Sequence, residues 1–467
     1  MKKEKTINSG SMPRRDFLKV SALGAAAAIA APSLLASCAG GGTSAKLVPL
    51  KQPGEYYIPA LPDKAPDGKP LRAGLVGCGG RGTGAAINFL NAATGVSIVA
   101  LGDVFEDRLQ STRDRLKKDF NTDIADDKCF IGFDSYQKVI DSGIDVVLLV
   151  TPPAFRPLHF KYATEKGIHS FLEKPVAVDG EGYRTMIATA RIAASKNLCV
   201  VTGTQRHHQR SYVASYQKIM EGAIGEIRGG NVYWNQNQLW YRTKQAGWTD
   251  MEWMIRDWVN WTWLCGDEIV EQHVHNIDVF TWFSGLRPIS AVGVGSRQRR
   301  VTGDGYDNFS IDFEFENGIH LHSMCRQIDG ASGKNTEIIQ GTKGVWYGGD
   351  NSDHHIVDLA GNEIWRYDKA AIEGTDTTPG LFAERNPYVL EHVNWISHIR
   401  SGQPINQAEE TAISTLAGIM GRDAAYTGAT VTWDEESAKV HGIVPETLAL
   451  ENVDMTKYTV PVPGTAK

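Results

Sequence analysis

The 467-residue sequence has few cysteines and no C-x-x-C pair. One of the six, Cys38, lies near the N-terminus, and the others are widely spaced and mostly in apolar surroundings. These other cysteines are Cys78, Cys129, Cys199, Cys265 and Cys325. An odd number at wide spacing indicates neither a disulfide framework nor a zinc knuckle. We therefore expect them to be buried and to behave as small hydrophobic residues.

The sequence also lacks a basic stripe. Its formal net charge is −6, and the first 38 residues contain six basic and two acidic residues, so the remainder carries −10. Nucleic-acid binding depends on neutralising phosphates, and an acidic body argues against that class of partner. Histidine pairs at 320/322 and 354/355 have no evident set of converging ligands, so no metal site is expected.

No hydrophobic run of the first 38 residues is long enough to favour a membrane span. The segment Pro13-Arg-Arg-Asp-Phe-Leu-Lys19 resembles a twin-arginine export signal, and the alanine-rich run after it contains Pro32. Leu35-Ala-Ser-Cys38 resembles a bacterial lipobox, whose cysteine is lipidated after cleavage. The alternative is cleavage nearby without a lipid. We expect an exported protein, periplasmic or anchored facing the periplasm, with a lipid on Cys38 as its sole membrane contact.

A glycine-rich turn organises the chain that follows. Leu71–Val76 is typical of a buried strand, and a helix can begin at the last of Gly77, Gly79 and Gly82, which have the spacing G-x-G-x-x-G. In a dinucleotide-binding turn these glycines permit a tight bend, close approach to a pyrophosphate and helix–strand packing. The pyrophosphate lies at the helix N-terminus, where free N–H groups favour negative charge. The alternative is a plain glycine turn.

The cofactor that this turn predicts is NAD. A second strand, Val96–Gly102, ends at Asp103, where a carboxylate meets ribose hydroxyls. This carboxylate would repel a 2′-phosphate, so NAD is preferred to NADP, although Arg81 and Arg108 weaken the preference. The expected cofactor contacts of this region are Gly77, Gly79, Gly80, Arg81, Gly82 and Asp103.

The hydrophobic pattern predicts an α/β fold with two domains. Continuous apolar strands alternate with helices over 71–203, which predicts a Rossmann dinucleotide-binding domain with a parallel sheet. Over 204–440 apolar and polar residues alternate along the expected strands, which predicts a C-terminal α/β domain with an open, largely antiparallel sheet. Residues 39–70 are expected to form a linker and 441–467 a tail. The expected strands are 71–76, 96–102, 129–131, 145–150, 168–172 and 198–202, then 227–234, 290–294, 308–316, 319–325 and 337–340. An exposed antiparallel sheet favours a homo-oligomer.

Two strand ends of the first domain carry candidate site residues. Thr151-Pro152 follows one strand, and Glu173-Lys174-Pro175 follows the next. Ends on one side of a parallel sheet face the ligand crevice. There the Lys174 ammonium could polarise a carbonyl or stabilise an alkoxide. The alternative is a surface lysine in a turn.

A second group of polar residues lies on a helix expected over 269–284. Glu271 and His275 are i,i+4 neighbours on one face, and Asp278 follows three residues later. A carboxylate beside an imidazole raises its basicity, which suits a general base near neutral pH. His273 lies on another face. The alternative is that His275 is structural.

Together these motifs resemble the Gfo/Idh/MocA superfamily, which includes glucose–fructose oxidoreductase and inositol dehydrogenase. The likeness covers about residues 71–433. It implies that Lys174 is the catalytic lysine, that His275 is the acid/base, and that Glu271 replaces the usual Asp. It also implies cofactor contacts from Thr151, Pro152, Arg156, Glu173, Lys174 and Gln205, with Arg156 in place of the histidine of many relatives. The Lys–Pro bond after Lys174 is often cis in this family, and His273 stands where relatives have glycine.

Tryptophan is concentrated in one segment. Seven of the twelve tryptophans lie between Trp234 and Trp263, where flat rings could stack on sugars. The alternative is that most belong to the core or to oligomer contacts. The expected substrate residues are Arg206, Asn235, Arg256, Trp258, His273 and Asp278, with Arg242 a further candidate for binding hydroxyls.

Export restricts the mechanism, because no replenished nicotinamide pool exists outside the inner membrane. We therefore expect an oxidoreductase that acts on a sugar or sugar derivative with a tightly bound, internally recycled NAD(H). One alternative is an NAD-dependent glycoside hydrolase resembling α-N-acetylgalactosaminidases, which oxidises, eliminates, adds water and reduces again. Those relatives lack an intact E-K-P, whereas Lys174 is present here. A second alternative is a sugar-binding lipoprotein without catalysis.

Overall fold

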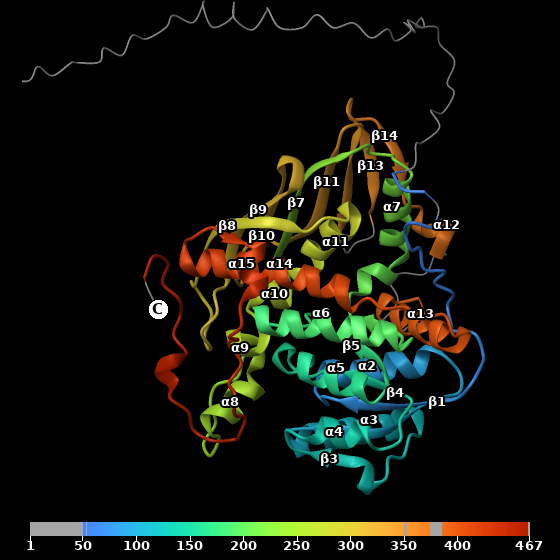
Figure 1. Cartoon of the computed structure of the whole chain (residues 1–467), viewed down its shortest axis with the longest axis vertical. Coiled ribbons are helices and arrows are strands. Elements are labelled where there is room, and N and C mark those ends of the chain that lie inside the picture. Colours follow the sequence, from blue (N-terminus) through green and yellow to red (C-terminus); the bar gives the residue numbers. More distant parts are fainter. Residues whose placement is uncertain (1–49, 53, 350–352, 374–384, 466–467) are drawn as a thin grey trace, which may run out of the picture. The chain divides into compact units, whose positions relative to one another are not determined.

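The computed structural model describes residues 50–52, 54–349, 353–373 and 385–465 (Figure 1). The predicted export signal and the predicted lipid site at Cys38 lie outside these residues. Among the described helices, none is both long and apolar enough to cross a bilayer. The five cysteines of the described chain are free, and four are buried, as their apolar surroundings predicted.

The first sheet is parallel and has six strands in the order β3-β2-β1-β4-β5-β6. The strands are β1 (Leu71–Val76), β2 (Val96–Asp103), β3 (Cys129–Ile131), β4 (Val146–Leu149), β5 (His169–Leu172) and β6 (Val200–Thr202). Every residue of β4 is buried, because successive side chains pack into apolar clusters on opposite faces. The Rossmann prediction is thus confirmed.

Helices cover both faces of this sheet. They are α2 (Gly80–Ala92), α3 (Glu106–Phe120), α4 (Ser135–Ile140), α5 (Arg156–Glu165) and α6 (Gly180–Ser195). Helices α2 and α3 share one apolar cluster with β1, and α4, α5 and α6 share the other with β4 and β5. A late helix, α13 (Pro387–Ser401), joins the first face, where Trp395 donates a hydrogen bond to the carbonyl of Cys199 at 3.1 Å.

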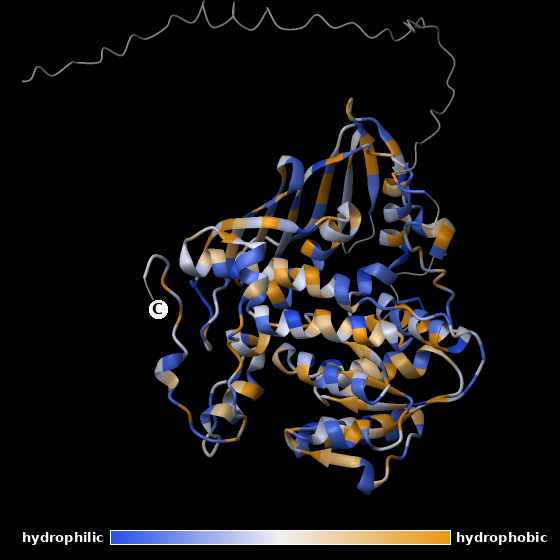
Figure 2. Ribbon diagram, in the orientation of Figure 1, coloured by the Kyte–Doolittle hydropathy of each residue, from blue (hydrophilic) through white to orange (hydrophobic). Residues whose placement is uncertain are grey.

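The second sheet has nine strands in the order β14-β13-β12-β11-β7-β10-β9-β8-β15. They are β7 (Ile227–Gln236), β8 (Pro288–Ser296), β9 (Asn308–Phe315), β10 (Ile319–Gln327), β11 (Lys334–Gly341), β12 (Gly344–Gly349), β13 (His355–Asp358), β14 (Glu363–Arg366) and β15 (Val431–Thr432). All neighbours are antiparallel except β7 and β10. Burial alternates along β9, and Figure 2 shows hydrophobic and hydrophilic residues alternating on these strands. The largely antiparallel sheet is therefore confirmed, and β12 to β14 extend it beyond the expected strands.

The remaining helices are α7 (Arg210–Met220), α8 (Asp250–Arg256), α9 (Thr262–Cys265), α10 (Glu268–Glu271), α11 (Val274–Ser284), α12 (Lys369–Glu373), α14 (Ala408–Thr427) and α15 (Trp433–Ala438). Short 3-10 turns include η2 (Pro153–Phe155), η3 (Gln205–His208), η4 (Trp258–Asn260), η5 (Glu316–Gly318) and η6 (Met455–Lys457). Helices α11 and α14 bury Phe280 and Met420 against Ile311 and Phe313 of β9.

The prediction of a single helix over 269–284 was wrong. The chain forms α10, leaves the regular helix at Gln272 and His273, and starts α11 at Val274. Glu271 therefore ends one helix, and His275 lies in the first turn of the next.

The expected linker and tail both contact the folded body. Residues 54–70 contain no helix or strand, yet Leu61 and Ala65 are buried in the apolar cluster beneath α2. In the tail, Tyr458 packs near Trp261, and the Pro461 carbonyl accepts a hydrogen bond from Tyr306 at 2.8 Å.

Candidate active site

The glycine turn between β1 and α2 leaves open space beside the N-terminus of α2. A Cβ at Gly77, where φ is +95°, would lie 2.7 Å from the Thr151 nitrogen. At Gly82 it would lie 1.8 Å from the Gly77 carbonyl oxygen. At Gly79 and Gly80 it would meet nothing within 4 Å. Two glycines are thus required by packing, whereas Gly79 and Gly80 border space that a pyrophosphate could fill.

This turn lines a cleft of about 380 Å³, which contains many of the expected cofactor residues. Of those residues, the cleft is lined by Gly77, Gly79, Gly80, Arg81, Gly82, Asp103, Thr151 and Pro152. Oxygens of Asp103 accept hydrogen bonds from the amides of Cys78 at 2.6 Å and Phe105 at 2.8 Å. Burial raises the pKa of Asp103, against the opposing effect of these two bonds. The glycine turn and the ribose acid therefore share one cleft, and these residues fit a dinucleotide.

Arg156 does not line this cleft. It is buried and donates hydrogen bonds to the carbonyls of Leu149 at 3.4 Å, of Thr151, and of Pro175 at 2.5 Å. Burial lowers the pKa of Arg156 to about 10. Arg156 thus ties the end of β4 to the turn after β5, and it supports the cleft from behind.

Arg81 connects the cleft to the Glu173-Lys174-Pro175 turn. Its guanidinium forms an ion pair with Glu173 and donates to Glu391 of α13 at 3.1 Å. Glu173 also accepts a hydrogen bond from the Lys174 amide at 3.2 Å, and the Lys174–Pro175 bond is cis. The family resemblance anticipated this cis bond.

The Lys174 ammonium pairs with Glu271. Its Nζ donates to the Glu271 carboxylate at 2.9 Å and also to the Glu271 backbone carbonyl. The two side chains are only 10% and 8% exposed. Glu271 was expected to face His275, but the break after α10 turns its carboxylate toward the lysine. An ammonium has three N–H groups, so one remains for a substrate oxygen.

His275 lies close enough to Lys174 to be affected by its charge. Burial, with added effects from Lys174 and Arg206, lowers the pKa of His275 well below its usual range. The imidazole is therefore neutral near pH 7, and the nitrogen that carries no hydrogen can accept a hydrogen bond. Its ring stacks on Trp234 with 5.5 Å between centroids. The Lys174 ammonium and the neutral His275 ring thus lie near each other where the Rossmann domain contacts the C-terminal domain.

Several expected substrate residues have partners elsewhere. Arg206 is buried and donates to Glu337 at 2.5 Å. Buried His273 bonds Ser323 at 2.7 Å, and burial lowers its pKa to about 3. Gln205, which was expected to contact the cofactor, is buried in η3 beside Arg206 and is not among the residues that line the cleft. These residues form part of the polar interior beneath the site.

Asp278 and Asn235 are likewise apart from the Lys174–Glu271 pair. Asp278 bonds His207 at 2.6 Å and accepts from Ser414 at 2.6 Å, and it lines a second cavity with Trp282. The Asn235 amide contacts the sulfur of Met324 at 3.9 Å. The i,i+3 spacing from His275 did not bring Asp278 into the same group.

Arg256 and Trp258 line the cofactor cleft, on the side opposite the glycine turn. Arg256 donates to both carboxylate oxygens of Asp107, at 3.0 and 3.1 Å. Trp258 packs edge-on against Trp240, which also lines the cleft. Trp261 and Trp263, in contrast, are buried in the core. The tryptophan segment is thus partly core and partly cleft wall.

Sequence reasoning missed two acidic partners of this site. Glu391 holds Arg81 across 310 positions, and Asp107 holds Arg256 across 149. Neither pairing has a local sequence signal. Within the described residues, no group of three or more His, Cys, Asp or Glu side chains is arranged to hold a metal ion.

Two family models match the chain. "Oxidoreductase family, NAD-binding Rossmann fold" matches residues 71–204, and "GFO/IDH/MocA C-terminal domain" matches residues 212–347. These matches place the dinucleotide turn and the Lys174 turn in the first model, and His275 in the second.

Individual relatives match the chain at low sequence identity. A scyllo-inositol 2-dehydrogenase (NAD(+)) of Bacillus subtilis is 21% identical over 375 residues, covering 79% of this chain and 98% of that protein. A glycosyl hydrolase family 109 protein of Streptomyces coelicolor is 26% identical over 211 residues, 45% of this chain and less than half (43%) of its own length. The structure of Lactobacillus casei scyllo-inositol dehydrogenase with bound NAD(H) and scyllo-inositol superposes with a TM-score of 0.58 at 19% identity, covering 78% of this chain and 99% of that one.

Proposed function

The chain belongs to the Gfo/Idh/MocA family of NAD-binding oxidoreductases, and on that premise we propose that it oxidises a secondary alcohol of a sugar or cyclic polyol. The observation that carries the proposal is the buried Lys174 ammonium beside a neutral His275. The relatives' names, an inositol dehydrogenase and a glycoside hydrolase, point to polyhydroxylated rings.

NAD, when bound to the cleft by the glycine turn and Asp103, supplies the hydride acceptor. His275 is unprotonated and accepts the proton of the substrate hydroxyl as the hydride leaves, because the departure of the hydride makes that hydroxyl strongly acidic. The free N–H of Lys174 donates a hydrogen bond to the oxygen as negative charge develops there. Glu271 fixes the lysine by two acceptors, and this orientation costs no rearrangement during the reaction.

We further propose that the cofactor stays bound and is returned to its starting state in each cycle, because the carbonyl of a second sugar takes up the hydride and a proton and is reduced to an alcohol. The predicted export signal supports this, since an exported enzyme has no nicotinamide pool to draw on. The predicted export signal also supports a periplasmic location, or anchoring there by a lipid on Cys38. A homo-oligomer is proposed through the outer face of the second sheet, where Val292 and Val294 are 48% and 70% exposed.

A second candidate is an NAD-dependent glycoside hydrolase. The match to the Streptomyces protein favours it, because that protein is named as a member of glycosyl hydrolase family 109. The same Lys174 and His275 would then act twice, in oxidation and in the final reduction. The intact Glu173-Lys174-Pro175 turn favours net oxidoreduction.

Purified protein without added cofactor tests these proposals. Mass spectrometry of the denatured supernatant should find NAD in about stoichiometric amount. A panel of sugars, inositols and glycosides then separates the functions: a keto-product indicates the oxidoreductase, and a released aglycone indicates the hydrolase. A third outcome is that no compound of the panel is converted, and that Lys174→Ala and His275→Ala leave sugar binding unchanged. This outcome would indicate a sugar-binding lipoprotein without catalysis. If the protein does not bind NAD even at millimolar concentration, both catalytic proposals are contradicted.

A further inference from the structure

Two segments close the side of the cofactor cleft that faces the glycine turn. One follows β7 and runs over residues 237–265 through α8, η4 and α9; the other is the C-terminal segment 444–458. We call the two together the clasp. Its residues in the cleft wall are Trp240, Arg242, Ile255, Arg256, Trp258 and Leu448. The clasp thus adds a mainly aromatic and cationic wall to a cleft whose other side is the Rossmann domain.

One ion pair joins the clasp to the Rossmann side at the ribose end. Arg256 donates two hydrogen bonds to Asp107, and its guanidinium lies 3.8 Å from the ring centre of Phe105. The hydrogen bond from Arg256 lowers the pKa of Asp107, so the carboxylate is ionised at neutral pH. Asp107 lies in the first turn of α3, four residues after Asp103. The pair therefore lies beside the acid expected to bind ribose.

The two segments of the clasp hold each other. The Met251 amide donates to the Glu451 carbonyl at 3.1 Å, and the Val453 amide donates to Asp250 at 3.3 Å. Figure 1 shows the C-terminal segment, in red, beside α8. An apolar cluster extends across both segments and reaches Phe105 of the Rossmann side. Opening the cleft on this side would thus move the clasp as a unit.

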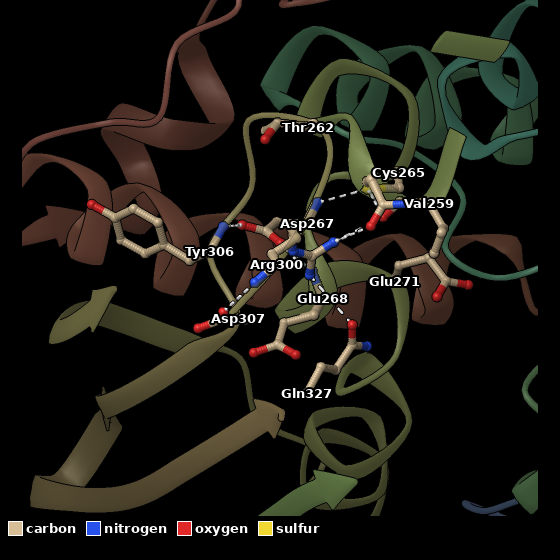
Figure 3. A network of polar contacts seen from close by, with 12 residues as sticks. Val259, Thr262, Cys265, Asp267, Glu268, Glu271, Arg300, Tyr306, Asp307 and Gln327 are labelled. Atoms are coloured by element: carbon tan, nitrogen blue, oxygen red, sulfur yellow. Dashed lines mark hydrogen bonds and ion pairs between the residues drawn. The ribbon is translucent and has the colours of Figure 1, made fainter. Parts of the chain in front are cut away.

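The base of the clasp is fixed by a buried polar network (Figure 3). Arg300 donates to the Val259 carbonyl at 3.3 Å and to Asn260 at 3.1 Å, and it pairs with Asp267 at 3.4 Å. Asp267 also accepts from the Tyr306 amide at 2.6 Å. Arg300 is 7% exposed, so these bonds are little weakened by water. With its base held, the clasp is joined to the Rossmann side in two ways: by the apolar cluster, which includes Phe105, Phe155 and Val178, and by the Arg256–Asp107 pair at the cleft.

We propose that the Arg256–Asp107 pair latches the clasp over the adenosine half of NAD and slows its release. The inference rests on the proposed function, because it supposes NAD in this cleft. A dinucleotide seated with its ribose at Asp103 lies between the glycine turn and the clasp. Its departure on this side requires the two charge-assisted hydrogen bonds to break. Arg256, expected from sequence to bind substrate, is thereby reassigned to cofactor retention.

The test measures the dissociation rate of NAD from the full chain. Protein loaded with isotope-labelled NAD is mixed with excess unlabelled NAD, and the labelled fraction that remains bound is followed by mass spectrometry. The variants are Arg256→Ala, Asp107→Ala, their double variant, and Asp107→Asn, which keeps the shape and loses the charge. Asp119→Ala is the matched control, because Asp119 pairs with Arg115 on the same helix and not with the clasp. Thermal unfolding verifies that each variant is folded.

We expect each latch variant to release NAD about tenfold faster, a change of ~1.4 kcal/mol in the barrier. The double variant should be no faster than the single ones, and Asp119→Ala should match the unchanged protein. Off-rates of the folded variants within twofold of the unchanged protein would overturn the latch while leaving the proposed function intact. Failure of the unchanged protein to bind NAD would instead overturn the proposed function, and the latch with it.

Discussion

The Nζ of Lys174 lies 2.9 Å from a carboxylate oxygen of Glu271, which connects the turn after β5 to the end of α10. Both side chains are almost fully buried, so the pair fixes the ammonium rather than leaving it in solvent. A buried pair that loses one member leaves an uncompensated charge. The lysine and the glutamate are therefore best tested together.

Lys174→Ala should reduce turnover by about 10²- to 10⁴-fold, the range of a positioned acid or base, while bound NAD is retained. Glu271→Gln should also reduce turnover, because the ammonium loses its charged acceptor but keeps its backbone one. The measurements are kcat and NAD content for each variant. Lys218→Ala is the matched control, since Lys218 also pairs with a glutamate, at 2.7 Å, on the surface of α7. Turnover of Lys174→Ala equal to that of Lys218→Ala would contradict a catalytic role.

The glycines of the turn should separate into two classes. Gly79→Ala and Gly80→Ala place a methyl group in open space, so the protein should fold normally but bind NAD at least about tenfold more weakly. Gly82→Ala places it 1.8 Å from the Gly77 oxygen, and should lower the free energy of unfolding by about 1–3 kcal/mol or more. Urea unfolding and NAD titration measure the two effects. Normal NAD affinity in both Gly79→Ala and Gly80→Ala would mean that the pyrophosphate lies elsewhere.

The sequence predicted those parts of the fold that local patterns specify. The continuous apolar run of β4 and the mostly apolar residues of β1 predicted buried strands, and the glycine spacing predicted the position of the cleft. The helix break at Gln272 could not be predicted, because the 3.6-residue periodicity continues through it. The break is favoured by a tertiary contact, the hydrogen bond from Lys174 to the Glu271 carbonyl.

The hydrogen-bond partners of the site residues could not be predicted from the local sequence. Arg256 looked like a free substrate ligand, but its partner Asp107 is 149 positions away on another domain. His273 was expected to contact the substrate, yet it bonds Ser323 and is fully buried in the interior of the domain. Only the packing of the Rossmann domain against the C-terminal domain shows which polar side chains are already paired.

Arg156→Met should destabilise the turns that line the cleft, although Arg156 itself does not line the cleft. The substitution preserves much of the side chain's apolar length but leaves the carbonyls of Leu149, Thr151 and Pro175 without their shared donor. Lost hydrogen bonds of this kind cost about 1–3 kcal/mol, so we expect a lower free energy of unfolding and weaker NAD binding. Arg191→Met, which removes an exposed arginine paired with Glu409, is the control. Equal losses in the two variants would show that Arg156 has no special role.

Stability should decrease as the pH falls below about 6.5. Burial lowers the pKa values of His159, His208 and His273 to about 3, whereas in the unfolded chain a histidine titrates near 6.5. The unfolded state therefore binds more protons in this range, so the stability contributed by each neutral histidine is complete above pH 6.5 and is lost toward pH 3. His207 acts in the opposite direction, because Asp278 outweighs burial and raises its pKa.

Between pH 7.5 and 5.5 each of the three histidines should cost about 1.4 kcal/mol of unfolding free energy. Urea unfolding at the two pH values measures the total, and His273→Gln, which can still hydrogen-bond Ser323, should reduce the pH dependence by about that amount. His320→Gln is the control, because His320 is exposed on β10. A His273→Gln variant that keeps the full pH dependence would show that the His273 pKa is not lowered by folding, and the same reasoning would then fail for the neutral His275 on which the proposed proton transfer depends.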